Sequence, residues 1–415
     1  MYDPFADFTV HALSNGVPVH ILYLPERSFV WAEFVFHAGM RDEQDFPSGT
    51  AHFLEHMVCA NSGMTLMEIK RFFSEVGGTF DAFTGFQSTR YGFKTPITGV
   101  EFDQGLSFLA QACLGNKLEN YFDREMEIIT SEIKQRYLNT KVMALRNKVT
   151  SLHYRGLPWS KAPFAAGTLE SLKQITPETI QLFNDAYYTP HNLSVVCVGG
   201  LSPEAVLTKL ERTIVNEMMP GVRNVLPGIM TSFPALLENN IEVSLAQGGG
   251  MGQASLDFKT LLPGFVSYQA AMVAADMITE LLYTEVRENR GLAYSMGAGV
   301  NTLGPFHDFS VSVSNIPSVK IDEVQAVVGE ILHSFTSNPI LFEGIKRKRV
   351  ANFLTRDSTV LGIKDGATAD LALHGRVVSL HEEMQACQKV SVNDVEQVAH
   401  FLNLSDEILR VAVYR

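Results

Sequence analysis

The sequence predicts an α+β protein made of two similar halves. Residues 175–200 and 390–415 share one pattern: a Thr or Ser cap, a helix with an acidic first turn, and an apolar strand. Between the two halves, residues 216–240 hold three prolines and two glycines without sustained periodicity, which is typical of a linker. Helix-then-strand units also occur in unrelated α/β proteins, so the repeat is a hypothesis drawn from pattern alone.

Hydrophobic periodicity and turn residues predict the remaining elements in order. In the first half we expect strands at 17–24 and 29–39, helices near 51–60, 65–76 and 123–139, and one strand over 79–94 after the turn at Gly77 and Gly78. In the second half we expect strands near 254–259, 294 and 309–313, and a helix from about 268 to 289. The predicted domains are therefore 1–220 and 241–415, joined by a linker at 221–240.

Composition and charge exclude several classes of protein. The 415 residues are 46% hydrophobic and 19% charged, as in ordinary globular proteins. Acidic residues outnumber basic ones by 45 to 33, so a broad nucleic-acid or anionic-membrane surface has no electrostatic support. Four scattered cysteines without a CxxC pair, and the absence of a targeting pattern or membrane-length apolar run, predict a cytoplasmic protein.

The segment HFLEH predicts a metal site. Its two histidines, His52 and His56, are four residues apart, so on a helix both imidazoles lie on one face with Glu55 beside them. Two imidazoles at this spacing are typical of zinc sites. The alternative is a helix that carries two partly exposed histidines with no metal.

A catalytic zinc site needs a third protein ligand, and the best candidate is Glu132. Glu125 and Glu132 are seven residues apart, which places both carboxylates on one face of a second helix. Taken alone, this pair is equally compatible with a solvated acidic face. Beside the histidine pair, it predicts a site of two imidazoles and one carboxylate.

With Glu132 standing 76 residues after His56, the HxxEH pattern resembles the inverzincins, the pitrilysin or insulinase type of zinc peptidase that includes the mitochondrial processing peptidase. Further matching segments are HAGMRDE at 37–43, GGTFDAFTGFQSTRYGF at 77–93 and VRENRGLAYS at 286–295. The resemblance implies one Zn²⁺ per chain, held by His52, His56 and Glu132. It also implies that Glu55 is the catalytic base and that Glu125 supports the ligands.

The resemblance implies the architecture as well: two α/β-sandwich domains, each a mostly antiparallel sheet packed with helices, together forming half of a clamshell. The first domain would be catalytic, and the second would be a pseudo-repeat that contributes to substrate binding. Within the family, a glycine-rich segment often precedes the substrate-binding pair of the second domain. Here residues 275–283, ADMITELLY, stand in its place.

Two groups of residues would bind the substrate by this resemblance. Ala82, Phe83 and Thr84 match the family's edge strand, where an extended peptide can add through main-chain hydrogen bonds; the alternative is an internal strand. Arg290 and Tyr294 match an Arg and Tyr pair that contacts the substrate. Arg290 and Gly291 are also explained by a helix end, where a cation and a left-handed glycine are favoured.

Together these features predict a zinc-dependent endopeptidase that hydrolyses extended or unfolded peptides. Zinc lowers the pKa of its water toward about 7, and Glu55 can accept the proton as that water attacks a peptide carbonyl. Because the chain resembles one half of the larger family members, a dimeric chamber is implied, as a homodimer or as a heterodimer with a related subunit. The alternative function is a non-catalytic scaffold or partner subunit.

Overall fold

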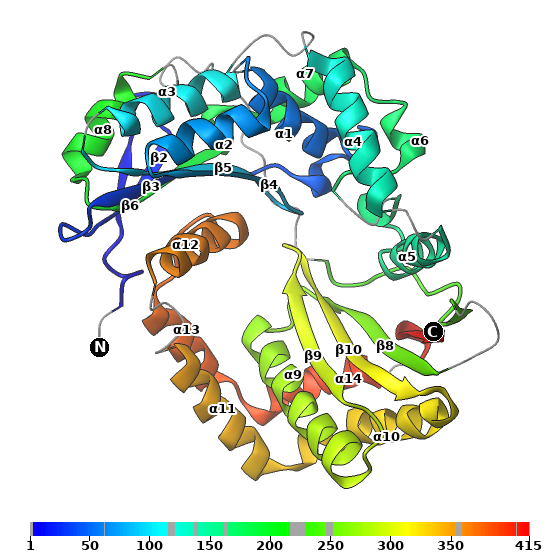
Figure 1. The fold of residues 1–415 in the computed structure, drawn as a ribbon. Coiled ribbons are helices and arrows are strands. Elements are labelled where there is room, and N and C mark those ends of the chain that lie inside the picture. The colour runs from blue at the N-terminus through cyan, green and yellow to red at the C-terminus, as the bar shows by residue number, and fades with distance from the viewer. Residues whose placement is uncertain are drawn as a thin grey trace. The chain divides into compact units, whose positions relative to one another are not determined.

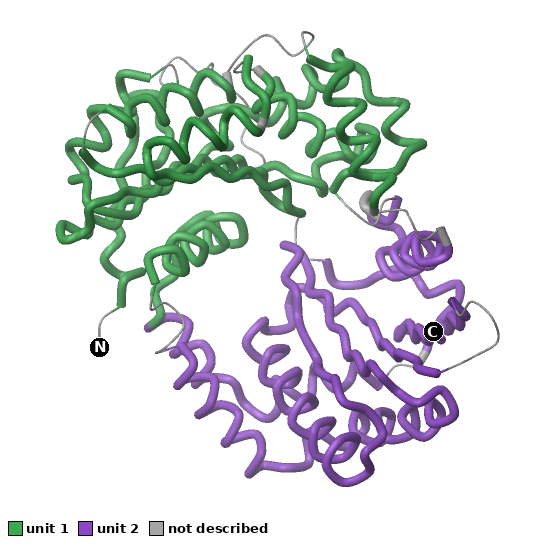
Figure 2. Tube along the Cα trace, in the orientation of Figure 1, with its two compact units in different colours: residues 1–138, 162–225, 356–380 green, residues 139–161, 226–355, 381–415 purple. Residues whose placement is uncertain are grey.

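The computed structural model describes residues 3–61, 63–98, 100–114, 121–136, 140–161, 165–213, 215, 230–245, 252–353, 359–403 and 405–414. The chain forms two compact units (Figure 2). Unit 1 comprises residues 1–138, 162–225 and 356–380, and unit 2 comprises residues 139–161, 226–355 and 381–415.

Unit 1 is built on a six-stranded sheet in the order β1-β2-β6-β3-β5-β4. Its strands are β1 (Thr9–Ala12), β2 (Pro18–Tyr23), β3 (Phe29–Phe36), β4 (Thr79–Thr84), β5 (Thr89–Pro96) and β6 (Leu193–Gly199). Only β2 and β6 pair in parallel; the other pairs are antiparallel. β4 is therefore an edge strand of a mostly antiparallel sheet.

Helices cover both faces of this sheet (Figure 1). Alternate strand residues face a large core shared with α1 and α3, and the others face α12. The helices of unit 1 are α1 (Thr50–Asn61), α2 (Leu66–Glu75), α3 (Glu101–Leu114), α4 (Phe122–Arg136), α6 (Leu169–Leu172), α7 (Pro177–Tyr187), α8 (Pro203–Glu211) and α12 (Val360–His374).

Unit 2 contains a five-stranded sheet in the order β7-β11-β8-β10-β9. Its strands are β7 (Asn240–Ser244), β8 (Gln253–Pro263), β9 (Ser295–Thr302), β10 (Phe306–Pro317) and β11 (Leu409–Tyr414). Its helices are α5 (Thr140–His153), α9 (Tyr268–Leu282), α10 (Ile321–Ser334), α11 (Pro339–Phe353), α13 (Leu380–Lys389) and α14 (Val392–Leu402).

The predicted repeat is confirmed by the strand order. From β2 to β6 and from β7 to β11, the five strands of each unit follow the same spatial order, with the first and last paired in parallel and the rest antiparallel. The two segments that suggested the repeat are α7 with β6 and α14 with β11. Their caps are the expected Thr176 and Ser391, whose side chains accept hydrogen bonds from the first helical turn.

Each unit also contains one helix from the half of the sequence that mainly forms the other unit. α5 precedes α6 in sequence but packs on β8 and β11 of unit 2, where Leu145, Val149 and Leu152 meet the sheet. α12 lies within the second half of the sequence but packs on β3 and β6 of unit 1. The division into domains 1–220 and 241–415 stays a prediction. Residues 221–229 of the predicted linker lie outside the described part of the chain.

Two sequence expectations need correction. Residues 79–94 do not form one strand: β4 and β5 make an antiparallel hairpin, turned where the amide of Gly85 donates to the carbonyl of Ser88 over 2.8 Å. The helix expected over 268–289 ends as α9 at Leu282 and continues as a π-helical turn, Tyr283–Asn289. None of the helices that the structure describes combines the length and apolar character that crossing a bilayer requires.

Candidate metal centre

The helix α1 presents both histidines, and its first turn is held by a buried carboxylate. Glu43 accepts hydrogen bonds from the backbone amides of Gly49, over 3.0 Å, and Ala51, over 2.8 Å. These amides lie at the start of α1, where the helix leaves its donors without internal partners. Burial raises the pKa of Glu43 to about 8, against the lowering effect of the two amides.

The helix α4 supplies the two glutamates and packs against α1. The rings of Phe53 on α1 and Phe122 on α4 stack with centroids 5.0 Å apart. Ile129 of α4 is fully buried in the same core. Glu125 and Glu132 lie one turn before and one turn after Ile129, so the packing directs that face of α4 toward α1.

Three ligand atoms converge between these helices, on His52, His56 and Glu132, all within 4.8 Å of one another. Glu132 Oε2 lies 3.8 Å from His52 Nε2 and 3.7 Å from His56 Nε2. Ligands about 2.1 Å from a tetrahedral zinc ion are about 3.4 Å apart, so small side-chain rotations suffice to fit this donor set to zinc. The residues that the sequence singled out as ligands therefore meet in space.

Glu125 orients His56. Its Oε2 lies 3.1 Å from Nδ1 of His56, so that nitrogen donates and Nε2 faces Glu132. Arg124 donates to the other oxygen of Glu125 over 2.8 and 3.0 Å. Burial disfavours charge on both partners, yet the carboxylates of Glu125 and Glu132 raise the pKa of His56 to about 9. His56 and Arg124 in turn lower the pKa of Glu125.

Glu55 lies beside the cluster and is bound to the edge strand. Its Oε2 accepts a hydrogen bond from Thr84 Oγ1 over 2.5 Å. Burial raises the pKa of Glu55, and the nearby carboxylates of Glu132 and Asp81 act in the same direction, while Thr84 and His56 oppose them. A carboxylate at this place can accept a proton from a nearby water and return it.

A small cavity of about 160 Å³ opens next to Glu55 and His56. Its wall includes Cys59 and Ala82, with the long side chains of Lys70 and Arg124 among the lining residues. The volume is about that of one large amino-acid side chain. A group held against β4 could therefore place a side chain beside the candidate metal centre.

The three residues of the predicted substrate strand differ in where their side chains lie. β4 is an edge strand, so the internal-strand alternative is wrong. Phe83 is exposed, with the guanidinium of Arg90 4.9 Å from its ring centre, whereas Thr84 is buried and faces Glu55. Ala82 is half-buried and lines the small cavity. Peptide binding at these residues stays a prediction.

In unit 2, the cation beside Tyr294 is Arg287. Its guanidinium lies 4.3 Å from the ring centre of Tyr294 and 4.9 Å from that of Tyr283. Arg290 instead lies near the carboxylates of Glu285 and Glu330, at 3.9 and 4.0 Å. Arg287 was not singled out from the sequence, because the pair Arg290 and Tyr294 came from the family resemblance alone; Arg287 lies in the π-helical turn, and substrate contact by Arg290 and Tyr294 stays a prediction. As predicted, Gly291 is left-handed, with φ +58°.

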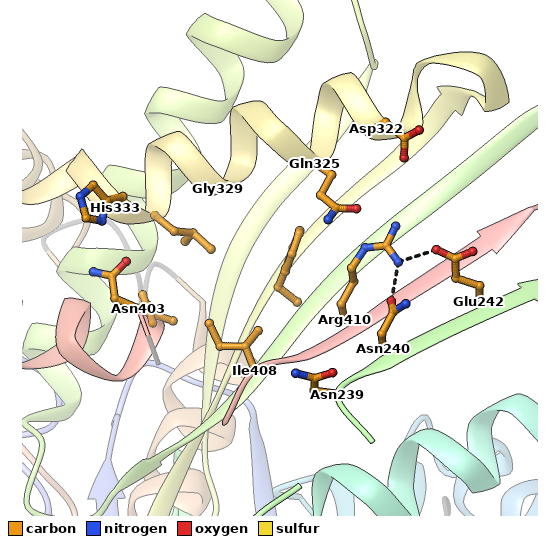
Figure 3. Close-up of a pocket in the computed structure, with 13 residues that line it drawn as sticks. Asn239, Asn240, Glu242, Asp322, Gln325, Gly329, His333, Asn403, Ile408 and Arg410 are labelled. Carbon is orange, nitrogen blue, oxygen red and sulfur yellow. Dashed lines mark hydrogen bonds and ion pairs between the residues drawn. The ribbon is translucent and has the colours of Figure 1, made fainter. Parts of the chain in front are cut away.

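A larger cavity of about 580 Å³ lies in unit 2 between α10, β7 and β11 (Figure 3). Arg410 extends into it and is paired with Glu242 over 2.8 Å. In unit 1, α8 packs at the corresponding place, where Lys209 bonds Asp103 of α3. Within the described residues, the grouping of potential metal ligands lies in unit 1, not in this cavity.

Comparison with known sequences identifies the family. Residues 19–163 match the profile described as Insulinase (Peptidase family M16), and residues 174–347 match that of the Peptidase M16 inactive domain. The chain belongs to peptidase family M16. The inactive-domain match covers residues 174–225 of unit 1 and 226–347 of unit 2. The insulinase match contains the candidate centre: His52, Glu55, His56, Glu125 and Glu132.

Several M16 relatives match most of the chain. An uncharacterized zinc protease of Rickettsia felis is 22% identical over 401 residues, which cover 95% of this chain and 94% of the relative. A probable mitochondrial-processing peptidase subunit beta of Arabidopsis thaliana is 27% identical over 188 residues, 44% of this chain and 33% of that protein. The crystal structure of a putative M16-like peptidase from Alicyclobacillus acidocaldarius matches with TM-score 0.81 at 18% identity, covering 98% of both chains. This M16 chain thus has the family's two-domain fold, and several of its relatives are named zinc proteases.

Proposed function

We propose that this M16 protein is a zinc-dependent endopeptidase that cleaves extended or unfolded peptides. The observation that carries the proposal is the convergence of His52, His56 and Glu132, with Glu55 next to them. One zinc ion per chain is the stoichiometry that a single such cluster supports. The family and the names of the relatives support the same class of reaction.

In the proposed reaction, Glu55 moves the proton. Zinc, when bound, supplies Lewis acidity that makes water more acidic and polarises the peptide carbonyl. Glu55 accepts a proton as the water oxygen bonds to the carbonyl carbon, and returns it to the nitrogen as the C–N bond breaks. Glu125 keeps the ring of His56 in place.

Unit 1 offers an edge for the peptide. Among the residues that the structure describes, β4 pairs with β5 alone, so an extended substrate can add to its other side by main-chain hydrogen bonds that demand little of the substrate's sequence. For unit 2 we propose that Tyr294 contacts the substrate together with Arg287, whose guanidinium stacks on its ring. Arg290 stays a second candidate from the sequence.

The test is hydrolysis of a quenched peptide library by purified protein, with metal analysis. Glu55→Gln should leave zinc bound but lower turnover by about 100-fold or more, because the base is lost and the ligands remain. A chelator should remove activity, and added zinc should restore it. Unchanged turnover in Glu55→Gln would refute the proposed role of the base, and a zinc-loaded wild type that cleaves no peptide would refute the proposal and favour a scaffold function. The cytoplasmic location and the dimer, whether homodimer or heterodimer, stay predictions; light scattering would measure the latter.

A further inference from the structure

We propose that Thr84 is a positioning residue for the base, so that the strand offered to the peptide also orients the group that starts its hydrolysis. This inference rests on the proposed function. Thr84 is the last residue of β4, its side chain is 6% exposed, and its hydroxyl donates to Glu55 Oε2 over 2.5 Å. No other part of the proposed mechanism needs a hydroxyl at this place.

The direction of this hydrogen bond gives the threonine its role. An ionised carboxylate can only accept, so the Thr84 hydroxyl must donate when Glu55 is ready to take a proton. The bond then fixes Oε2 and leaves Oε1 as the oxygen that receives the proton. Hydrogen bonds to a charged group are short and strong, so this bond restrains the rotation of the carboxylate.

The strand joins this bond to the peptide-binding edge. Residues of β4 alternate between two faces, and Phe80 and Thr84 share the buried face that looks toward α1. On one side the main chain of Thr84 pairs with Thr89 of β5, and on the other side the described residues supply no partner strand. A peptide that adds to that free side would therefore steady the same residue that orients Glu55.

The competing explanation is that Thr84 is an ordinary buried threonine. The chain offers a matched control in Thr89, its partner across the hairpin. Thr89 is also buried, and its hydroxyl also donates, over 2.9 Å, but to the backbone carbonyl of Ala38. If burial alone mattered, removing either hydroxyl would have similar consequences.

The test uses the full-length, zinc-loaded protein and a quenched peptide that the wild type cleaves. Thr84→Val and Thr84→Ala should each lower kcat by about 10- to 100-fold, the usual cost of misplacing a catalytic group by about 1 Å. KM and bound zinc should change little. Thr84→Ser, which keeps the hydroxyl, should restore kcat, and Thr89→Val should retain it.

Each other outcome overturns the proposal. Wild-type kcat in Thr84→Val or Thr84→Ala would show that the base needs no such partner. A Thr84→Ser variant as slow as Thr84→Val would assign the loss to packing, as would an equally slow Thr89→Val. Both of these results leave the proposed function standing. If the wild type shows no cleavage that Glu55→Gln abolishes, the proposed function fails and the role of Thr84 falls with it.

Discussion

Within unit 1, a buried ion pair joins α12 to β3, and breaking this ion pair should destabilise the unit strongly. Lys364 Nζ on α12 lies 3.0 Å from Glu33 Oε2 on β3, and the two side chains are 10% and 8% exposed. Thr368 donates to the same carboxylate oxygen over 2.8 Å. We expect Lys364→Met to lower the free energy of unfolding by about 3 to 5 kcal/mol, because Glu33 stays buried without its cation.

The structure favours the lower end of that range, since the Thr368 hydroxyl still serves Glu33 after the lysine is gone. It also predicts that the double variant Glu33→Met, Lys364→Met returns close to the wild-type stability, because replacing a buried pair by apolar side chains of similar volume is often neutral or stabilising. Thr368 keeps a second acceptor, the carbonyl of Lys364, over 2.9 Å. The double variant therefore leaves no hydroxyl stranded.

The assay is urea unfolding followed by the fluorescence of Trp31, whose ring centre lies 5.5 Å from Lys364 Nζ. The chain has two tryptophans, so a Trp159→Phe background makes the signal local. The control is Arg71→Met, which removes an exposed pair with Glu75 in the same unit and should leave the free energy of unfolding almost unchanged. A Lys364→Met variant as stable as that control, or a double variant as unstable as the single one, would refute the reasoning.

Two further predictions concern acid stability and metal affinity. Burial lowers the pKa of His20 to about 4, below its ordinary 6.5, so its stabilisation is complete above pH 6.5 and is lost as the pH falls toward 4. This loss of stability amounts to at most about 3 kcal/mol, and His20→Leu should abolish it. Urea unfolding between pH 6.5 and 4 measures the loss, and a variant whose stability falls as steeply with pH as that of the wild type would contradict the prediction. Glu125→Gln should weaken zinc binding by about 10- to 100-fold, because the orienting partner of His56 loses its charge. Competition with a chromophoric chelator measures this, and unaltered affinity would disprove it.

The sequence predicts the elements of the centre well because each of its signals is local. The spacing of His52 and His56 is a property of one helix, and that of Glu125 and Glu132 is a property of another. The histidine pair and the family resemblance together predict Glu132 as the third ligand. The packing of Phe53 on Phe122 is the physical reason why the two helices bring Glu132 close to the histidines. Cap residues and apolar strands likewise predicted α7 with β6 and α14 with β11.

Features that depend on distant contacts were not predictable in this way. The apolar residues of a helix do not show which sheet will cover them, so nothing local predicts that α5 packs on unit 2 and α12 on unit 1. The hairpin was read as one strand because alternation continues through residues 79–94 on both sides of the turn at Gly85. The bond of Thr84 to Glu55 joins a strand to a helix, and only strand alternation hints that this threonine faces inward.

Comparing the two repeats shows why the proposed chemistry would belong to one unit. After the second strand of the five-strand repeat, unit 1 continues into α1 and unit 2 into α9. α9 contains no histidine, its buried positions are mainly Ala, Val, Met, Ile and Leu, and its acidic residues Asp276 and Glu280 are paired with Arg349 and Lys348. Residues 275–283, which stand in place of the family's glycine-rich segment, belong to α9 up to Leu282. Both units thus have the same sheet and a helix packed on it, while among the described residues the grouping of potential metal ligands lies on α1 and α4 of unit 1, which is the physical basis for expecting one ion per chain rather than two.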